Sequence, residues 1–217
     1  MRTALDPGAL RELVAASPAV AAVAPRLAAA AAAITVAPPF AVTRLWLDRE
    51  VAPRRATFSA VSREPTLDSV TVYSRLERPS AEWAQRTGGS VVELHSYACD
   101  APDVDTATAR MRAELAALWP ETADAQVVHL QQRMQATAPA FPPGGAGRRA
   151  TVTGLARGVR VAGDHVATPL LCGLMERAAV SGVLAANDVL DEVGAGPEEI
   201  RGIPQRGLLA GLLPRRG

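Results

Sequence analysis

The stretch from Val159 to Leu190, VRVAGDHVATPLLCGLMERAAVSGVLAANDVL, constrains the fold more than any other part of the chain. It joins a short apolar strand, a Gly163-Asp164 turn and a helix rich in small residues. A glycine at the end of a strand lets the backbone pass close to another group, because glycine has no Cβ. Asp164 then projects from the strand end, where ligands usually lie in α/β sheets. The segment therefore predicts a ligand held between a strand end and a helix start.

Small side chains line one face of the predicted helix, which runs from about Gly173 to Leu190. Residues three and four positions apart share a helix face, and those that do so here are Ala178, Ser181, Gly182, Ala185 and Ala186. We expect this thin face to press against a sheet. The first turn, Leu174 to Arg177, should offer free N–H groups and the positive end of the helix dipole to an electron-rich ligand.

Helices are predicted near the start of the chain and again after residue 103. Asp6 and Pro7 are typical of an N-cap and a first helical position, and Pro18 interrupts the apolar pattern that follows. A second helix is predicted over Ala24 to Ala33. TATARMRAELAALWP, which opens at Asp105-Thr106, is an amphipathic helix that ends before Pro120.

Alternating apolar and polar residues predict strands between these helices. In PFAVTRLWLDREV, the apolar Val42, Leu45 and Leu47 contrast with Thr43, Arg44 and Asp48. The same alternation recurs over Leu67 to Glu77 and Gly89 to Cys99, and AQVVHLQQRM resembles a further strand. Polar connectors join these segments, and successive strands joined in this way are typical of an antiparallel sheet. PAFPPGGAGRRA, residues 139–150, is a Pro/Gly-rich connector and the clearest break in composition.

The charge pattern argues against nucleic acid as a partner. The net charge is +1, every basic side chain is Arg rather than Lys, and the Arg residues are interspersed with acidic ones. Two distant cysteines, Cys99 and Cys172, do not form a disulfide framework, so a cytoplasmic location is expected. The start lacks the apolar core of a signal peptide. GLLAGLLPRRG at the C-terminus predicts either peripheral membrane contact or a frayed terminus.

Polar residues elsewhere in the chain do not form a known catalytic motif. His95, His129 and His165 lack metal-ligand spacing, and no Ser or Cys lies in a nucleophile-elbow context. We therefore assign no metal site and no catalytic residue. His95 and Tyr97, two positions apart on a predicted strand, point the same way, either into a substrate cavity or into ordinary packing.

The GDHVATP and GLMERAAVSGVLAANDVL segments resemble the C-terminal flavin-contacting part of the amine oxidase and phytoene desaturase superfamily. In that part of the superfamily, a Gly-Asp turn meets a helix of the form E-x-A-x-x-S-G-x-x-A-A, which Glu176 begins here. APPFAVTRLWLDREV and GGSVVELHSYA are similar to bacterial carotenoid desaturases, particularly the isorenieratene synthase-like group that makes aromatic carotenoid end groups.

The resemblance implies an FAD cofactor and hydride transfer from an apolar, carotenoid-like substrate to the flavin. It implies that Asp164 hydrogen-bonds the ribityl side of FAD and that Met175 and Glu176 lie by the pyrimidine edge of the flavin. The implied cofactor-binding set is Gly163, Asp164, Leu174, Met175, Glu176 and Ala179. A helix N-terminus at that edge would stabilise the negative charge of reduced flavin.

The resemblance also implies an α+β fold: an α/β FAD-domain remnant packed with an antiparallel-sheet substrate domain. The expected parts are a helical segment (1–34), the substrate domain (35–138), a connector with the returning FAD-binding strand and helix (139–193), and a flexible tail (194–217). No strand–G-x-G-x-x-G–helix unit is found, because GGAGRR follows a Pro-rich loop. The two-domain flavoprotein fold is therefore incomplete. The alternative is a non-catalytic remnant or subunit that needs a separate N-terminal FAD-domain partner chain.

Overall fold

The computed structural model describes residues 2–170 and 172–202. The GLLAGLL segment and its predicted membrane contact lie outside the described residues. The chain divides into two compact units, with boundaries after Val36 and after Ala136, so that the first unit contains both ends of the described chain. Helices combine with a five-stranded antiparallel sheet, and the predicted α+β class is confirmed.

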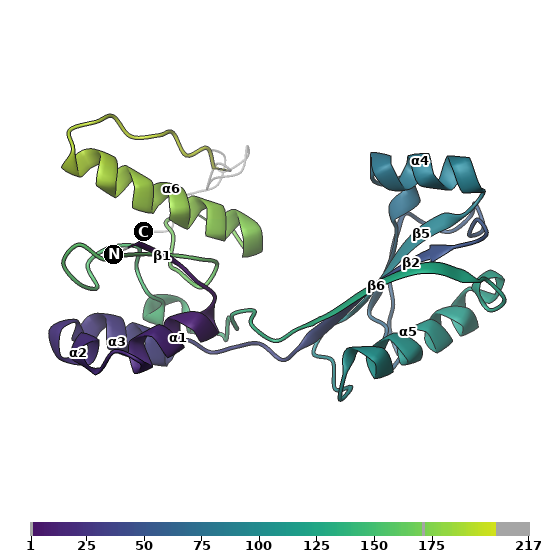
Figure 1. Ribbon diagram of the computed structural model, residues 1–217, viewed down its shortest axis with the longest axis horizontal. Coiled ribbons are helices and arrows are strands. Elements are labelled where there is room, and N and C mark those ends of the chain that lie inside the picture. Colours follow the sequence, from purple (N-terminus) through teal and green to yellow (C-terminus); the bar gives the residue numbers. More distant parts are fainter. Residues whose placement is uncertain (1, 171, 203–217) are drawn as a thin grey trace, which may run out of the picture. The chain divides into compact units, whose positions relative to one another are not determined.

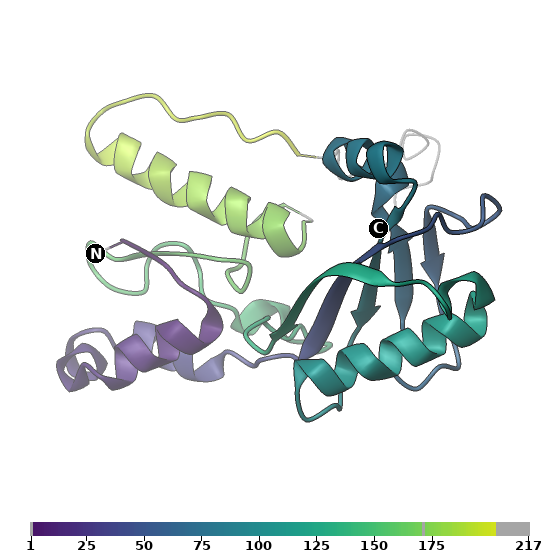
Figure 2. The same cartoon turned by 45° about the vertical axis from the view of Figure 1, so that its right-hand side comes forward.

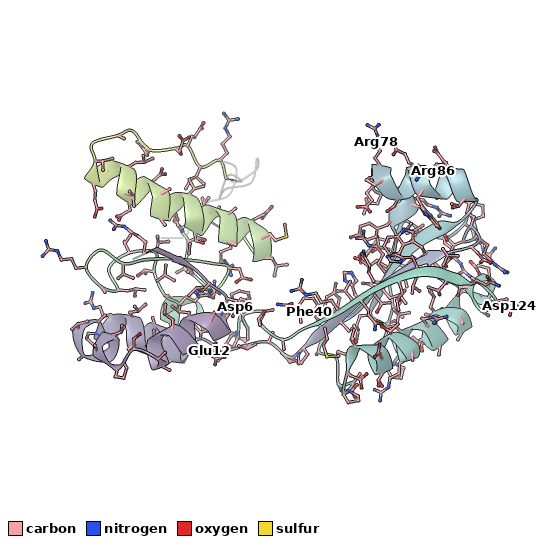
Figure 3. All side chains as sticks on the ribbon, viewed as in Figure 1. Asp6, Glu12, Phe40, Arg78, Arg86 and Asp124 are labelled. Atoms are coloured by element: carbon pink, nitrogen blue, oxygen red, sulfur yellow. The ribbon has the colours of Figure 1, made fainter. Side chains whose placement is uncertain are left out.

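The first unit has three short helices before the chain enters the second unit, and each begins at a proline. They are α1 (Pro7–Ala15), α2 (Pro18–Val23) and α3 (Pro25–Ala33). Asp6 lies at the start of α1 (Figure 3), where its Oδ1 accepts a hydrogen bond from Ala9 N at 3.0 Å. Pro18 was predicted to interrupt a helix. It also starts a new one, because proline's fixed φ suits the first helical position.

A two-stranded parallel sheet lies between these helices and a long C-terminal helix. Strand β1 (Arg2–Ala4) pairs with β7 (Arg160–Ala162), and α6 (Leu174–Glu192) lies on the side of the pair away from α1 (Figure 1). The turn η3 (Ala146–Arg148) lies within the predicted connector. The apolar core of this unit contains Leu10, Leu27, Ala31, Val152, Val161 and Val166.

The second unit is an antiparallel sheet with a helix on each face. The strands lie in the order β3-β4-β5-β2-β6, and their bounds are β2 (Phe40–Leu47), β3 (Phe58–Ala60), β4 (Ser69–Val72), β5 (Ser90–Ser96) and β6 (Val127–Gln135). Helix α5 (Val104–Leu118) covers one face and α4 (Arg78–Thr87) the other (Figure 2). Two single turns complete the unit, η1 (Tyr73–Arg75) and η2 (Pro120–Thr122).

Strand β2 corrects the predicted alternation. Its buried positions are Ala41, Thr43, Leu45 and Leu47. Val42, predicted to be on the apolar face, is half-buried on the opposite face. Thr43 is fully buried beneath α5 because its hydroxyl shares a 2.6 Å hydrogen bond with that of Thr108. The polar character of Thr43 is therefore satisfied inside the core.

The predicted strand over Leu67 to Glu77 is shorter than expected. Only Ser69–Val72 is extended, and the chain then turns at Tyr73. The turn is closed by backbone hydrogen bonds from Leu76 N and Glu77 N to Tyr73 O, both 3.0 Å. It places the Tyr73 ring 3.9 Å from the Arg44 guanidinium carbon, so a cation–π contact replaces continued strand pairing.

Within the described residues, none of the helices is both long and apolar enough to cross a bilayer. The same part of the chain contains no cluster of His, Cys, Asp and Glu side chains that would hold a metal ion.

Candidate functional site

The candidate site lies at the carboxyl end of the parallel β1–β7 pair. Because the two strands are parallel, with Ala4 opposite Ala162, their carboxyl ends share one edge. The chain continues from β7 into Gly163, where a Cβ would lie 2.7 Å from His165 Nδ1 and 3.2 Å from Leu5 O. The φ of Gly163 is also positive, at 154°. Close approach and backbone conformation therefore both require glycine here.

Ser181 fixes the Gly163 turn against α6. Its Oγ accepts a hydrogen bond from Gly163 N at 2.9 Å and lies 3.1 Å from Gly163 O. Among the small residues predicted to line the helix, Ser181 is fully buried, Ala178, Gly182 and Ala185 are half-buried, and Ala186 is exposed. The helix therefore contacts the strand end through a hydroxyl as well as through small side chains.

Asp164 leaves its carboxylate available at this edge. The side chain is 30% exposed, and His165 Nδ1 lies 4.0 Å from Asp164 Oδ1, beyond hydrogen-bond distance. No donor among the described residues makes a hydrogen bond to this carboxylate. An ionised carboxylate is an acceptor only, so Asp164 has the capacity to accept hydrogen bonds from the hydroxyl groups of a ligand.

His165 is buried beside the turn without a hydrogen-bond partner for either ring nitrogen in the described part of the chain. Burial lowers its pKa, although Asp164 and Asp6 act in the opposite direction, so the ring is neutral near pH 7. His165 lines a cavity of about 320 Å³ together with Ile34, Phe141 and Arg149. Sequence reasoning treated this histidine as an ordinary polar loop residue, because burial is a tertiary property.

The start of α6 presents unpaired backbone donors and exposed apolar side chains. Gly173 supplies no side-chain cap, and the N–H of Arg177 is used by Gly173 O at 3.2 Å. In the described part of the chain, the backbone N–H groups of Leu174, Met175 and Glu176 have no acceptor, so the predicted free N–H groups are reduced to these three. Leu174 and Met175 are 67% and 85% exposed, so the first turn is open to an apolar or electron-rich group.

Arg177 connects this helix start to the Asp164 turn, a role that sequence reasoning missed. Its guanidinium donates to Cys172 O at 2.5 Å and to Asp164 O at 3.4 Å. It also lies 4.6 Å from the centroid of the Phe141 ring. Ser181 and Arg177 together hold Gly163 and Asp164 against α6, whereas Glu176 and Ala179 are exposed residues of that helix.

The other predicted pair lies in the second unit. His95 is on β5 and Tyr97 directly follows the strand, and their side chains are hydrogen-bonded, with His95 Nδ1 2.8 Å from Tyr97 Oη. The two residues therefore do lie on the same side of the sheet.

Residues 4–190 match the sequence profile of the family described as flavin containing amine oxidoreductase. The chain belongs to this family. The predicted superfamily is thus confirmed, and the family description implies a flavin cofactor.

Two curated relatives of this chain carry the same name. A carotenoid phi-ring synthase from Streptomyces griseus is 46% identical over 96% of this chain and 40% of its own length. A carotenoid phi-ring synthase from Chlorobaculum tepidum is 36% identical over 82% of this chain and 28% of its own length. The chain therefore spans less than half the length of these relatives.

A solved structure supports the fold of this family member. The crystal structure of an oxidoreductase from Methanosarcina mazei aligns with a TM-score of 0.50 and 16% identity, covering 83% of this chain and 40% of that chain. At this identity the likeness concerns the fold alone.

Proposed function

We propose that the chain is the C-terminal part of an FAD-dependent oxidoreductase that dehydrogenates an apolar, carotenoid-like substrate. The two relatives named carotenoid phi-ring synthase support the substrate class. The observation that carries the cofactor is the locked Gly163 turn, which leaves the Asp164 carboxylate without a protein donor at a strand end. Family membership supports a flavin as the cofactor.

The residues at the strand end fit FAD. Asp164 would accept hydrogen bonds from ribityl hydroxyls, and Gly163 provides the space for a close approach. The free N–H groups and dipole of the α6 first turn, at Leu174, Met175 and Glu176, would stabilise negative charge on the flavin ring. Ala179, one turn further along, completes the proposed contact set. When bound, FAD would supply the hydride acceptor.

The chain's own residues would position the substrate rather than activate it covalently. The exposed Leu174 and Met175 present apolar surface at the helix start, and burying apolar area against a polyene or ring is favourable at about 25 cal/mol per Å². Arg177 links the helix start to the Asp164 turn through hydrogen bonds to Asp164 O and Cys172 O. Correct placement of the C–H bond is itself a large part of catalysis by such sites.

A flavin-retention assay tests this proposal. The purified chain is mixed with FAD, desalted and examined for bound-flavin absorbance. We expect retention in the wild type and its loss in Asp164→Ala. Asp191→Ala is the matched control, because Asp191 is an exposed acidic residue of α6 that makes no described side-chain contact. Equal retention by wild type and Asp164→Ala would contradict the role given to Asp164.

The small parallel sheet favours a second candidate, a subunit that needs a separate dinucleotide-binding partner. Parallel sheets are normally larger and covered on both faces, yet β1 and β7 pair only with each other among the described residues. The outer edge of β7 is partly used, because Val161 N donates to Val152 O at 3.0 Å, but the edge of β1 away from β7 pairs with no described strand and would be the place to accept a strand from another polypeptide. If the chain alone is colourless but retains FAD after co-expression with a separate G-x-G-x-x-G-containing chain, this second candidate is correct.

A further inference from the structure

The cavity that contains His165 lies entirely within the first unit. Its volume is about 320 Å³, and its lining comes from the end of α3 with the two residues that follow, from the Pro/Gly-rich connector and from His165. This volume is at the small end of the range for ligand pockets, about 300–1,000 Å³. The cavity is therefore large enough for a small molecule and needs no residue of the second unit.

Backbone hydrogen bonds join the segments that form the cavity wall. Ala140 N donates to Thr35 O at 2.8 Å, which connects the Pro/Gly-rich segment to the chain after α3. Ala167 N donates to Ala150 O at 2.8 Å, which connects the end of the same segment to the stretch that carries His165. The wall is therefore a folded arrangement of backbone rather than a gap between surface side chains.

His165 brings two unsatisfied ring nitrogens to this cavity. Its side chain is 2% exposed, and neither Nδ1 nor Nε2 has a hydrogen-bond partner in the described part of the chain. A buried polar group without a partner destabilises the fold. A neutral imidazole offers one N–H donor and one acceptor. A ligand oxygen that accepts a hydrogen bond from the ring would remove part of this cost.

Arg149 adds a positive charge to the same wall. Its guanidinium carbon lies 4.7 Å from the centroid of the Phe141 ring, and that of Arg177 lies 4.6 Å from the same centroid. Burial lowers the pKa of Arg149 and the nearby charge of Arg177 lowers it further, although the guanidinium stays ionised near pH 7. Both effects disfavour the charge, so an anion beside Arg149 would be stabilised.

The acidic side chains nearby leave the Arg149 charge unneutralised. Asp164 and Asp6 act on the imidazole of His165, where they favour the protonated ring. Neither of them forms an ion pair with Arg149, and none of the other described carboxylates does so. Arg148 also lines the cavity and is exposed at its rim. The cavity therefore has a net positive wall on the side of the connector.

The remaining lining defines the body of a ligand that would fit. It is largely apolar, from Ala33, Ile34, Pro139, Phe141 and Pro142. A carboxylate suits the polar part, because its two oxygens accept two parallel hydrogen bonds from one guanidinium. A phosphate dianion carries more charge than one guanidinium neutralises, and more oxygens than one guanidinium and one imidazole N–H satisfy. The lining thus favours a monoanion with an apolar body.

We propose that this cavity binds a small carboxylate with an apolar body. Arg149 binds the carboxylate through its guanidinium, and His165 donates its ring N–H to one carboxylate oxygen. The apolar lining around Ile34 and Phe141 covers the rest of the ligand. This site goes beyond the proposed oxidoreductase, because it takes a second ligand and does not depend on bound FAD.

A titration of the purified chain with cyclohexanecarboxylate at constant ionic strength tests the site. The chain has three histidines, so their imidazole NMR signals can be assigned by substitution. We expect a saturable shift of the His165 signals, with those of His95 and His129 unchanged. Cyclohexanecarboxamide has a similar shape without the charge and should bind at least about tenfold more weakly. Inorganic phosphate has the charge without the apolar body and should cause no saturable shift.

Two variants locate the binding groups. Arg149→Gln should weaken cyclohexanecarboxylate binding by at least about tenfold, because a charge-assisted hydrogen bond is lost. Arg157→Gln is the matched control. Arg157 is an exposed residue of the same unit that does not line the cavity, so the affinity should stay within about twofold of wild type. His165→Phe keeps a planar ring without an N–H and should also weaken binding, with circular dichroism confirming that the variant is folded.

Each other outcome overturns a defined part of the proposal. A wild type without a saturable His165 shift has no such site. Equal affinities for the carboxylate and the amide, or tighter binding of phosphate, overturn the carboxylate class. Equal weakening in Arg149→Gln and Arg157→Gln assigns the effect to net charge and overturns the site.

The proposed function and the carboxylate site fail in different ways. If chain that retains FAD no longer binds cyclohexanecarboxylate, the cavity belongs to the flavin. That result overturns the carboxylate site and leaves the oxidoreductase intact. If the chain binds cyclohexanecarboxylate but Asp164→Ala retains as much FAD as wild type, the carboxylate site stands and the role proposed for Asp164 is contradicted.

Discussion

The hydroxyl of Ser181 contacts both backbone groups of Gly163, accepting from its N–H at 2.9 Å and lying 3.1 Å from its carbonyl oxygen. One side chain of α6 therefore replaces the strand partner that the end of β7 lacks at this position. Gly163 is half-buried, and a buried N–H that loses its acceptor costs up to about 3 kcal/mol, so the clamp contributes to both the stability and the position of the Asp164 turn.

Ser181→Ala tests the clamp directly. The N–H of Gly163 loses its acceptor, so we expect the first unit to lose about 1–3 kcal/mol of unfolding free energy. All three tryptophans lie between residues 46 and 119, in the second unit, so tryptophan fluorescence does not report this change. Hydrogen exchange of the Gly163 amide, measured by NMR, does report it and should become faster.

Gly182→Ala is the control for Ser181→Ala. It lies next to Ser181 in α6, and a Cβ there meets no atom within 4 Å. Alanine is favoured over glycine inside helices by about 0.5–1 kcal/mol, so this variant should be as stable as wild type or more so. Unchanged exchange at Gly163 in Ser181→Ala would mean that the hydroxyl contact does not persist in solution.

Gly163→Ala should destabilise the first unit. The new Cβ would lie 2.6 Å from His165 Cε1 and 3.2 Å from the backbone oxygen of Leu5, and the φ of 154° is one that L side chains rarely adopt. Overpacking of this kind typically costs about 1–3 kcal/mol. Thermal unfolding followed by circular dichroism checks it. Gly196→Ala, where the Cβ meets open space, is the control, and similar unfolding curves for both variants would show that the turn can relax.

The sequence predicted those helix and strand positions that are determined by residues close together in the chain, such as caps, prolines and the period of apolar residues. Asp6 and Pro7 start α1 as a cap and a first position, and α5 ends where Pro120 removes the next donor. The Gly-Asp turn and the helix that follows were also found from the sequence, because a strand, a glycine and a small-residue helix have distinct periodicities.

Properties that depend on long-range contacts were not predictable. The alternating pattern predicted that Thr43 faces solvent. In the structure Thr43 is in the core, because Thr108, 65 positions later, supplies a hydrogen-bond partner there. Ser181 belonged to the recognised helix pattern, yet its contact with Gly163 spans 18 positions. His165 and Arg177 were missed for the same reason, because burial and carbonyl contacts arise only when the turn folds back on α6.

Thr43 and Thr108 should behave as a coupled pair. Thr43→Val leaves the Thr108 hydroxyl buried without its partner, and the reverse holds for Thr108→Val, so each single variant should lose about 1–3 kcal/mol. In the double variant both hydroxyls are gone and two shape-matched apolar groups meet. Its loss should be clearly smaller than the sum of the single losses. Urea unfolding followed by tryptophan fluorescence measures all three, and strict additivity would show that the 2.6 Å contact carries no coupling.

Glu121 should make the stability of the second unit depend on pH. Two hydrogen bonds from Arg55, at 2.7 and 2.8 Å, lower the pKa of Glu121 from 4.5 to about 2. A carboxyl whose folded-state pKa lies below its unfolded value stabilises the fold above the unfolded pKa. That contribution is therefore complete above about pH 4.5 and is lost as the pH falls towards 2.

Glu121→Gln should remove this part of the pH dependence. Urea unfolding followed by tryptophan fluorescence at pH 6 and pH 3 should show a smaller difference between the two pH values in Glu121→Gln than in wild type. Glu82→Gln, which disrupts the highly exposed pair with Arg78, should change stability by less than about 0.5 kcal/mol, because exposed ion pairs contribute little. If Glu121→Gln keeps the full pH difference of wild type, the acid sensitivity of the unit arises from other carboxylates, of which Glu93 is the next to test because its pKa is also lowered.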